Sequence, residues 1–158
     1  MQYILMLLVV IIATVADQLS KLWIVANIDL GGRIEALEGI FHLTYVQNFG
    51  AAFSSFEGMR WLFALIFAVF TIGMVWEFSK KRMPFSDFER WCIVFIFAGG
   101  LGNMIDRVRL GYVVDMIEVE FIKFPVFNVA DCFITCGCIL LIAHLMLFNK
   151  EFWKEDKK

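Results

Sequence analysis

The sequence predicts an α-helical integral membrane protein with four transmembrane helices and a small extracytoplasmic β-element. Three observations support this fold class. First, 61% of the 158 residues are hydrophobic and the mean hydropathy is +0.76, whereas ordinary soluble domains are about 45–50% apolar. Second, four apolar runs approach the roughly 20 residues that a helix needs to cross a bilayer. Third, polar and charged residues gather in two connectors between these runs.

The four membrane helices form one embedded domain over residues 1–158. We expect them at residues 4–26, 61–78, 89–106 and 129–148. The third apolar run, Trp91 to Ile105, is short, so its helix is expected to include flanking residues such as Phe88 or Asp106. The first run resembles a cleaved signal peptide, but it has no basic start and no small-x-small cleavage site, and it continues beyond Lys21. We therefore interpret it as a permanent helix.

The charges of the loops predict how the chain crosses the membrane. Residues 79–90 carry four basic and two acidic side chains, and the tail 149–158 carries four lysines. Residues 27–60 carry two basic and four acidic side chains. Short cytoplasmic loops are enriched in lysine and arginine. We therefore expect loop 79–88, the tail and both termini in the cytoplasm, with connectors 27–60 and 107–128 on the outer side.

Both outer connectors contain the alternation of a β-strand. Phe41, Leu43 and Tyr45 would share one strand face, and residues 112–123 alternate in the same way. We infer a small β-element on the outer membrane face, built from both connectors. Asp115 is then the one carboxylate on an otherwise apolar strand face, and burial of that kind raises the pKa of a carboxyl group.

Asp115 and Asp131 are candidates for acid–base chemistry. Asp131 lies where the fourth helix begins, three residues after Asn128, and a helix N-terminus favours an anion. One desolvated and one stabilised carboxylate is the arrangement of an aspartyl pair that shares a proton and activates water. The structural alternative is that Asp131 only caps its helix and that Asp115 pairs with Arg107 or Arg109. From spacing alone, both interpretations stand.

Three further patterns are compatible with purely structural roles. Asp17 and Lys21 are spaced for an i,i+4 ion pair, which read alone is a structural pair at the lipid boundary. The segment 48–54 combines a turn residue, a glycine and small side chains, which indicates close backbone approach. The glycines in 99–102 follow no strand, so close helix packing is a simpler use for them than a nucleotide-binding loop.

The metal-ligating residue types do not form a convincing site. The four cysteines lie in apolar segments, which argues against a disulfide framework. Cys132, Cys136 and Cys138 offer soft thiolate ligands for copper, but helix packing is the simpler role. His42 and His144 lie far apart, so they do not jointly bind zinc at an outer site, and we expect no metal. No basic patch indicates nucleic-acid binding.

Five short motifs occur in order along the four spans. They are DQLSK (17–21), NFGAAFS (48–54), GNMIDR (102–107), VVDMI (113–117) and FNVAD (127–131). Each is weak alone, but the ordered set resembles the bacterial lipoprotein signal peptidase family, also called signal peptidase II, over nearly the whole chain. The resemblance implies an aspartic-type endopeptidase of the bacterial cytoplasmic (inner) membrane, with its active site near the outer face. Such enzymes use two aspartates and no cofactor to remove signal peptides from prolipoproteins, cutting before the S-diacylglyceryl-modified cysteine.

The resemblance also implies roles for individual residues. The aspartates of VVDMI and FNVAD, Asp115 and Asp131, would be catalytic. The residues implied to bind substrate or support the site are Asn48, Gly50, Asn103, Arg107, Asn128, Asp17 and Lys21. Asp106 is expected to be structural and near an arginine. Cys132 stands where the family often has serine, so we expect catalysis to tolerate it and the thiol to permit inhibition by alkylation.

Two other function classes remain as alternatives. A proton-coupled carrier would place its functional charges near the bilayer midplane, whereas here they gather at one face. A non-catalytic scaffold would leave the different environments of Asp115 and Asp131 unexplained. For the peptidase, the expected partners are diacylglyceryl-modified prolipoproteins and membrane lipid, with no nucleic acid and no metal. We expect a monomer, because four helices can enclose a single site.

Overall fold

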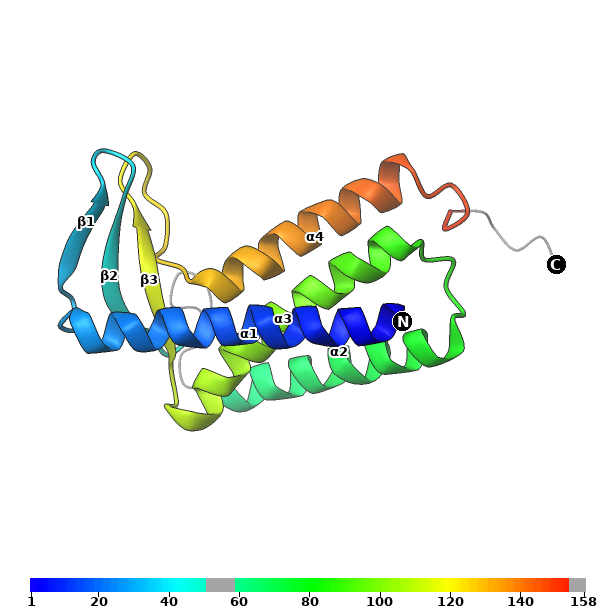
Figure 1. Cartoon of the computed structure of the whole chain (residues 1–158), viewed down its shortest axis with the longest axis horizontal. Coiled ribbons are helices and arrows are strands. Elements are labelled where there is room, and N and C mark those ends of the chain that lie inside the picture. The colour runs from blue at the N-terminus through cyan, green and yellow to red at the C-terminus, as the bar shows by residue number, and fades with distance from the viewer. Residues whose placement is uncertain (51–58, 154–158) are drawn as a thin grey trace.

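Four long helices form the body of the molecule, and a three-stranded sheet lies at one end of them (Figure 1). The computed structural model describes residues 1–50 and 59–153. In chain order these residues form α1 (Gln2–Asn27), β1 (Arg33–Leu37), β2 (Phe41–Asn48), α2 (Arg60–Lys80), α3 (Asp87–Arg109), β3 (Val113–Val119) and α4 (Val129–Leu147). Within this part of the chain, four helices are long and apolar enough to cross a membrane. The predicted fold class is confirmed.

α3 is longer than the apolar run that predicted it, because polar residues extend it at both ends. It begins at Asp87 rather than at residue 89, since Ser86 and Glu89 form a capping box. The Ser86 hydroxyl oxygen accepts a hydrogen bond from the Glu89 N–H, and the Glu89 carboxylate accepts one from the Ser86 N–H. At the other end the helix continues to Arg109, so it carries the whole GNMIDR motif.

α2 also continues beyond its apolar run. It extends to Lys80 and ends at Lys81, which adopts the left-handed backbone conformation that often terminates helices. The connection expected over residues 79–88 is therefore reduced to residues 81–86.

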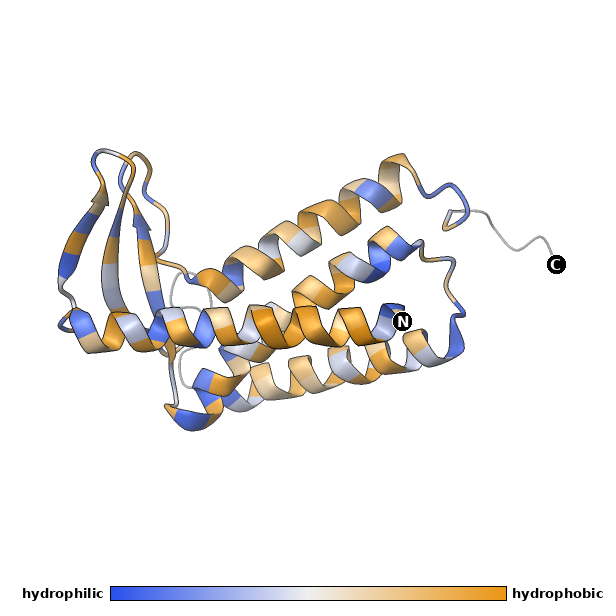
Figure 2. Ribbon diagram, viewed as in Figure 1, coloured by the Kyte–Doolittle hydropathy of each residue, from blue (hydrophilic) through white to orange (hydrophobic). Residues whose placement is uncertain are grey.

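α3 is the central helix of the bundle. It packs against α1 and α4 and also touches α2. The apolar core between α1 and α3 consists of Met6, Val10, Ala13, Val94 and Ala98. α2 buries only Glu77 among its described side chains, and many of its apolar side chains, such as Trp61, Leu65 and Val69, are exposed. Figure 2 shows hydrophobic residues along the helices, as a lipid-facing bundle requires.

The sheet is antiparallel in the order β1-β2-β3, and it buries one face against the C-terminal end of α1. The buried residues on this side are Ile24, Ile28, Tyr45, Val114 and Met116. Asp115, between two of them in β3, therefore faces the opposite way. β1 was not anticipated from the sequence, because all five of its residues remain exposed and give no burial pattern to detect.

The close approach of α3 to α4 leads to a first testable prediction. A Cβ atom on Gly99 would collide with the backbone carbonyl oxygen of Ala130, whereas one on Gly73 in α2 would meet open space. Gly99→Ala should therefore destabilise the protein by about 1–3 kcal/mol through overpacking. Gly73→Ala, the matched control, should be neutral or slightly stabilising because alanine favours a helix. Thermal unfolding in detergent would measure both, and equal melting temperatures would contradict the close packing.

Candidate active site

A cavity of about 1500 Å³ opens between the sheet and the helices. β2 and β3 line it from one side, and α2, α3 and α4 line it from the others. Its polar lining includes Asn48, Asn103, Arg107, Asp115 and Asp131. Further from the sheet the walls are apolar and include Phe67, Phe70 and Ile134. The cavity thus joins a polar end beneath the sheet to an apolar groove between α2 and α4.

Asp131 is held at the N-terminus of α4 by a reciprocal cap. The side-chain oxygen of Asn128 accepts a hydrogen bond from the Asp131 N–H at 2.9 Å, and Asp131 Oδ2 accepts one from the Asn128 N–H at 3.2 Å. Asp131 Oδ1 accepts a third bond from Asn103 Nδ2 at 2.8 Å. Asn128 is therefore the N-cap residue, and Asp131 combines a capping role with a place in the cavity wall.

Asp115 is buried on β3, with only 2% of its surface exposed. Its two carboxyl oxygens accept hydrogen bonds from Asn48 Nδ2 at 2.8 Å and from Asn128 Nδ2 at 2.7 Å. Burial raises the pKa of Asp115 to about 6, and the negative charge of Asp131 adds to this effect, while the two asparagines oppose it. Within residues 1–50 and 59–153, no arginine forms an ion pair with Asp115, so the arginine-pairing alternative is wrong for this part of the chain.

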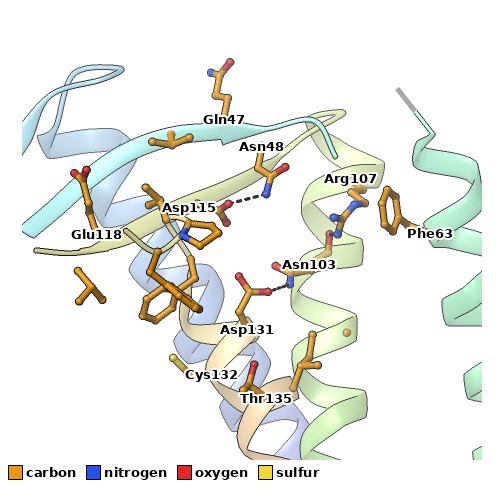
Figure 3. Close-up of a pocket in the computed structure, with 18 of the residues that line it drawn as sticks. Gln47, Asn48, Phe63, Asn103, Arg107, Asp115, Glu118, Asp131, Cys132 and Thr135 are labelled. Carbon is orange, nitrogen blue, oxygen red and sulfur yellow. Dashed lines mark hydrogen bonds between the residues drawn. The ribbon is translucent and has the colours of Figure 1, made fainter. Parts of the chain in front are cut away.

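Two asparagines connect the aspartates. Asn128 Nδ2 donates to Asp115 and also to Asn103 Oδ1 at 3.1 Å, and Asn103 in turn donates to Asp131. Figure 3 shows Asp115 on the strand and Asp131 on the helix below it, and both side chains line the same cavity. The structure thus brings together residues from α3, β3 and α4 that are up to 28 positions apart.

Arg107 ties the end of β2 to the helices. Its guanidinium donates to the Gly50 carbonyl oxygen at 2.8 Å and to the Asn103 carbonyl oxygen at 3.3 Å. It also lies over the Phe63 ring, 4.3 Å from the ring centre, in a cation–π contact. Asn48 Oδ1 accepts a bond from the Gly50 N–H at 2.9 Å, so both backbone polar groups of Gly50 are fixed. Residues 51–54 of the NFGAAFS motif lie outside the described residues.

Asp17 and Lys21 lie behind the cavity rather than in its lining. They form the expected i,i+4 ion pair at 2.9 Å, and Lys21 Nζ also lies 3.0 Å from Asp106 Oδ2 and 3.0 Å from Asn103 Oδ1. Within the described residues, the ion-pair partner of Asp106 is therefore Lys21. Lys21 and Asp106 meet because α1 and α3 pack side by side, which sequence spacing does not reveal.

Two residues in this region escaped the sequence analysis. Gln18 Nε2 donates to Asp106 Oδ1 at 2.9 Å and lies 3.2 Å from Asp17 Oδ2. Gln18 could have been identified from the sequence, because it is a polar residue beside Asp17 within a largely apolar run. Phe63, which contacts Arg107, is an ordinary aromatic residue of an apolar run, so nothing in the sequence distinguished it.

The cysteines divide between the cavity and the helix packing. Cys132 and Cys136 line the cavity, and Figure 3 shows Cys132 next to Asp131. Cys92 is buried and Cys138 is partly exposed on α4. In the part of the chain that the structure describes, no three histidine, cysteine, aspartate or glutamate side chains converge in a way that could hold a metal ion.

The geometry suits hydrolysis of a peptide bond. A carboxyl group with a raised pKa can donate a proton near neutral pH, and a carboxylate at a helix N-terminus can accept one. Asp115 and Asp131 supply these two environments in one cavity. A water molecule and a carbonyl group between them would meet both a base and an acid.

Comparisons with known proteins agree with this chemistry. The family described as signal peptidase (SPase) II matches the chain over residues 9–147. A protein of Streptococcus agalactiae named lipoprotein signal peptidase is 43% identical over 156 residues, which cover 99% of this chain and 96% of that protein. A protein of Lactococcus lactis with the same name is 41% identical, over 96% of this chain and 99% of its own length. A solved structure described as a bacterial membrane enzyme is 32% identical and superposes with a TM-score of 0.85, covering 97% of this chain and 93% of that one.

Proposed function

Because this chain belongs to the lipoprotein signal peptidase family, signal peptidase II, we propose that Asp115 and Asp131 are its catalytic pair. The protein is an aspartic-type peptidase of the membrane that removes signal peptides from prolipoproteins. The observation that carries the assignment is the hydrogen-bonded connection from Asp115 through Asn128 and Asn103 to Asp131. This connection holds two carboxyl groups of opposite environment at one cavity.

The proposed mechanism gives each aspartate one starting role. Asp131 is ionised and takes a proton from a water molecule, whose oxygen attacks the scissile carbonyl carbon. Asp115 is protonated and gives its proton to the carbonyl oxygen as the tetrahedral intermediate forms. When the carbon–nitrogen bond breaks, the proton held by Asp131 passes to the leaving amine, and Asp115 regains its own from the intermediate's hydroxyl. No metal ion takes part in these steps.

The remaining site residues bind substrate or hold the pair in place. Asn48 would contact the substrate backbone, because it borders the cavity where it meets β2. Gly50 would support the site, because its N–H donates to Asn48 and its carbonyl oxygen accepts from Arg107. Asn103, Arg107 and Asn128 would shape the site.

The substrate would be a prolipoprotein whose cysteine carries a diacylglyceryl group. Its acyl chains would remain in lipid while the scissile bond reaches the carboxyl groups at the polar end of the cavity. The apolar walls nearer the middle of the helices suit this placement. We place the sheet and the site at the outer membrane face and both termini in the cytoplasm, and we propose that residues 1–158 act as one monomeric peptidase domain.

Cleavage by the purified protein in detergent tests this function. The substrate would be a prolipoprotein with and without the diacylglyceryl group, each in the presence and absence of EDTA. We expect cleavage of the modified substrate before its cysteine, little cleavage of the unmodified one, and no effect of EDTA. Inhibition by EDTA would contradict the metal-free mechanism, and equal cleavage of both substrates would contradict the lipid requirement.

The pH dependence of kcat/KM provides a separate prediction. Asp115 must keep its proton to act as the acid, and burial raises its pKa to about 6. As the pH rises above this value the group ionises, so kcat/KM should fall by about tenfold per pH unit. The apparent value belongs to the pair, since the two carboxyl groups interact. A profile that stays flat from about pH 5 to pH 8 would contradict the role of Asp115 as the acid.

A further inference from the structure

The two residues that precede the catalytic aspartates are held in the same way. The N–H of Val114, which precedes Asp115, donates to Asp106 Oδ2 at 3.1 Å. The N–H of Ala130, which precedes Asp131, donates to Asp17 Oδ1 at 3.0 Å. Val114 and Ala130 are 1% and 0% exposed, so their N–H groups need partners inside the protein. In each case a carboxylate on a different element supplies the partner: Asp106 on α3 for Val114 of β3, and Asp17 on α1 for Ala130 of α4.

One ammonium group connects the two carboxylates. Lys21 Nζ lies 2.9 Å from Asp17 Oδ2 and 3.0 Å from Asp106 Oδ2. All three side chains are at least 97% buried. The short distances and the burial leave little freedom, because separating a buried ion from its partner exposes it to a poorly solvating interior. Val114 and Ala130 are therefore both connected to Lys21 Nζ, each through one carboxylate.

The same ammonium group also reaches the hydrogen-bonded connection between the aspartates. It donates to Asn103 Oδ1, and Asn103 Nδ2 donates to Asp131 Oδ1. Asp17, Lys21 and Asp106 do not line the cavity, so a substrate there would touch none of them. Any influence of these side chains on the reaction must act through the residues that they hold.

We propose that Asp17, Lys21 and Asp106 are positioning residues that set the separation and orientation of the catalytic pair through the peptide N–H groups of Val114 and Ala130. This inference rests on the proposed function of Asp115 and Asp131 as that pair. It assigns the ion cluster a task in catalysis that is distinct from joining α1 to α3. A purely structural cluster would stabilise the fold without affecting the rate of the folded enzyme.

A change of one methylene group separates the two roles. Asp106→Glu keeps the negative charge but moves the carboxylate relative to Val114. A misplacement of about 1 Å remote from the chemistry can reduce a rate by about 10²-fold. Glu89→Asp is the matched control, because Glu89 is also a fully buried carboxylate of α3 but lies at the opposite end, where it contacts His144 and Asn149. It makes the same one-methylene change in the other direction.

The experiment measures kcat, KM and thermal unfolding for both variants with a diacylglyceryl-modified prolipoprotein in detergent. We expect Asp106→Glu to lower kcat by about 10- to 100-fold with little change in KM. Glu89→Asp should keep kcat per folded molecule near the wild-type value. A loss of activity in Asp106→Glu that only follows the loss of folded protein would overturn the proposal. A rise in KM with unchanged kcat would also overturn it, because it would indicate a role in binding substrate.

A second pair of variants covers the case in which Asp106→Glu does not fold. Asp106→Asn keeps an oxygen that can accept the Val114 N–H, whereas Asp106→Ala removes it. The asparagine variant should retain at least about tenfold more kcat than the alanine variant, and equal values would overturn the proposal. Asp115→Asn, measured in parallel, tests the catalytic pair itself. An inactive Asp115→Asn together with a fully active Asp106→Glu would overturn the positioning role alone.

Discussion

Asp115→Asn and Asp131→Asn are each expected to lower kcat for prolipoprotein cleavage by about 10²–10⁴-fold. Asparagine has nearly the same size and keeps an oxygen for hydrogen bonds, but it can neither take a proton from water nor give one to the substrate. Both variants should fold, since Asn128 still caps α4 and the sheet still packs on α1. Initial rates with a diacylglyceryl-modified prolipoprotein, at substrate concentrations above KM, would measure the loss.

The control for this pair is a carboxylate outside the cavity. Glu38 is exposed in the turn between β1 and β2, so Glu38→Gln should keep wild-type activity. Thermal unfolding of all three variants would separate lost chemistry from lost folding. Near-normal cleavage by either aspartate variant would remove that residue from the catalytic pair.

Lys21→Met is expected to reduce the free energy of unfolding by about 3–5 kcal/mol. Methionine has a similar length but no charge, so Asp17 and Asp106 would remain buried as two carboxylates without their shared ammonium group. Leaving a buried ion without its partner is far more costly than the net gain from forming the pair. Unfolding in detergent with increasing denaturant would measure the change.

An exposed ion pair gives the comparison for Lys21. Arg33 and Glu118 lie 2.8 Å apart with side chains 61% and 24% exposed. Arg33→Gln should cost less than about 1 kcal/mol, because water screens the pair and solvates the remaining charge. Similar losses for Lys21→Met and Arg33→Gln would show that water reaches the Lys21 cluster.

The sequence predicts the membrane helices well because their signal is local. Hydropathy over about 20 residues identifies each span, and the capping box of Ser86 and Glu89 explains why α3 begins two residues before the expected start. β1 was missed because exposed strand residues need no pattern of their own. Its place is set by its pairing with β2.

The candidate site was only partly accessible to sequence reasoning. Asp115 and Asp131 could be chosen by their expected environments and by the resemblance of their motifs. The asparagine connection between them could not be predicted, because it depends on how α3, β3 and α4 meet in space. The partner of Asp106 could not be predicted for the same reason, since Lys21 lies 85 positions away in the chain and reaches it only through helix packing.

The hydrogen bonds of Asn128 restrict which side chains its position can accept. Its oxygen accepts the Asp131 N–H, and its nitrogen donates to both Asp115 and Asn103. Aspartate would place an acceptor oxygen where Asp115 and Asn103 each need a donated hydrogen bond. Serine would be too short to reach the three groups. Glutamine would extend too far from the start of the helix. Asparagine alone among the twenty amino acids carries an acceptor and a two-proton donor at this length. Asparagine is therefore the only one of the twenty amino acids that can both cap α4 at this position and connect Asp115 with Asp131 through hydrogen bonds.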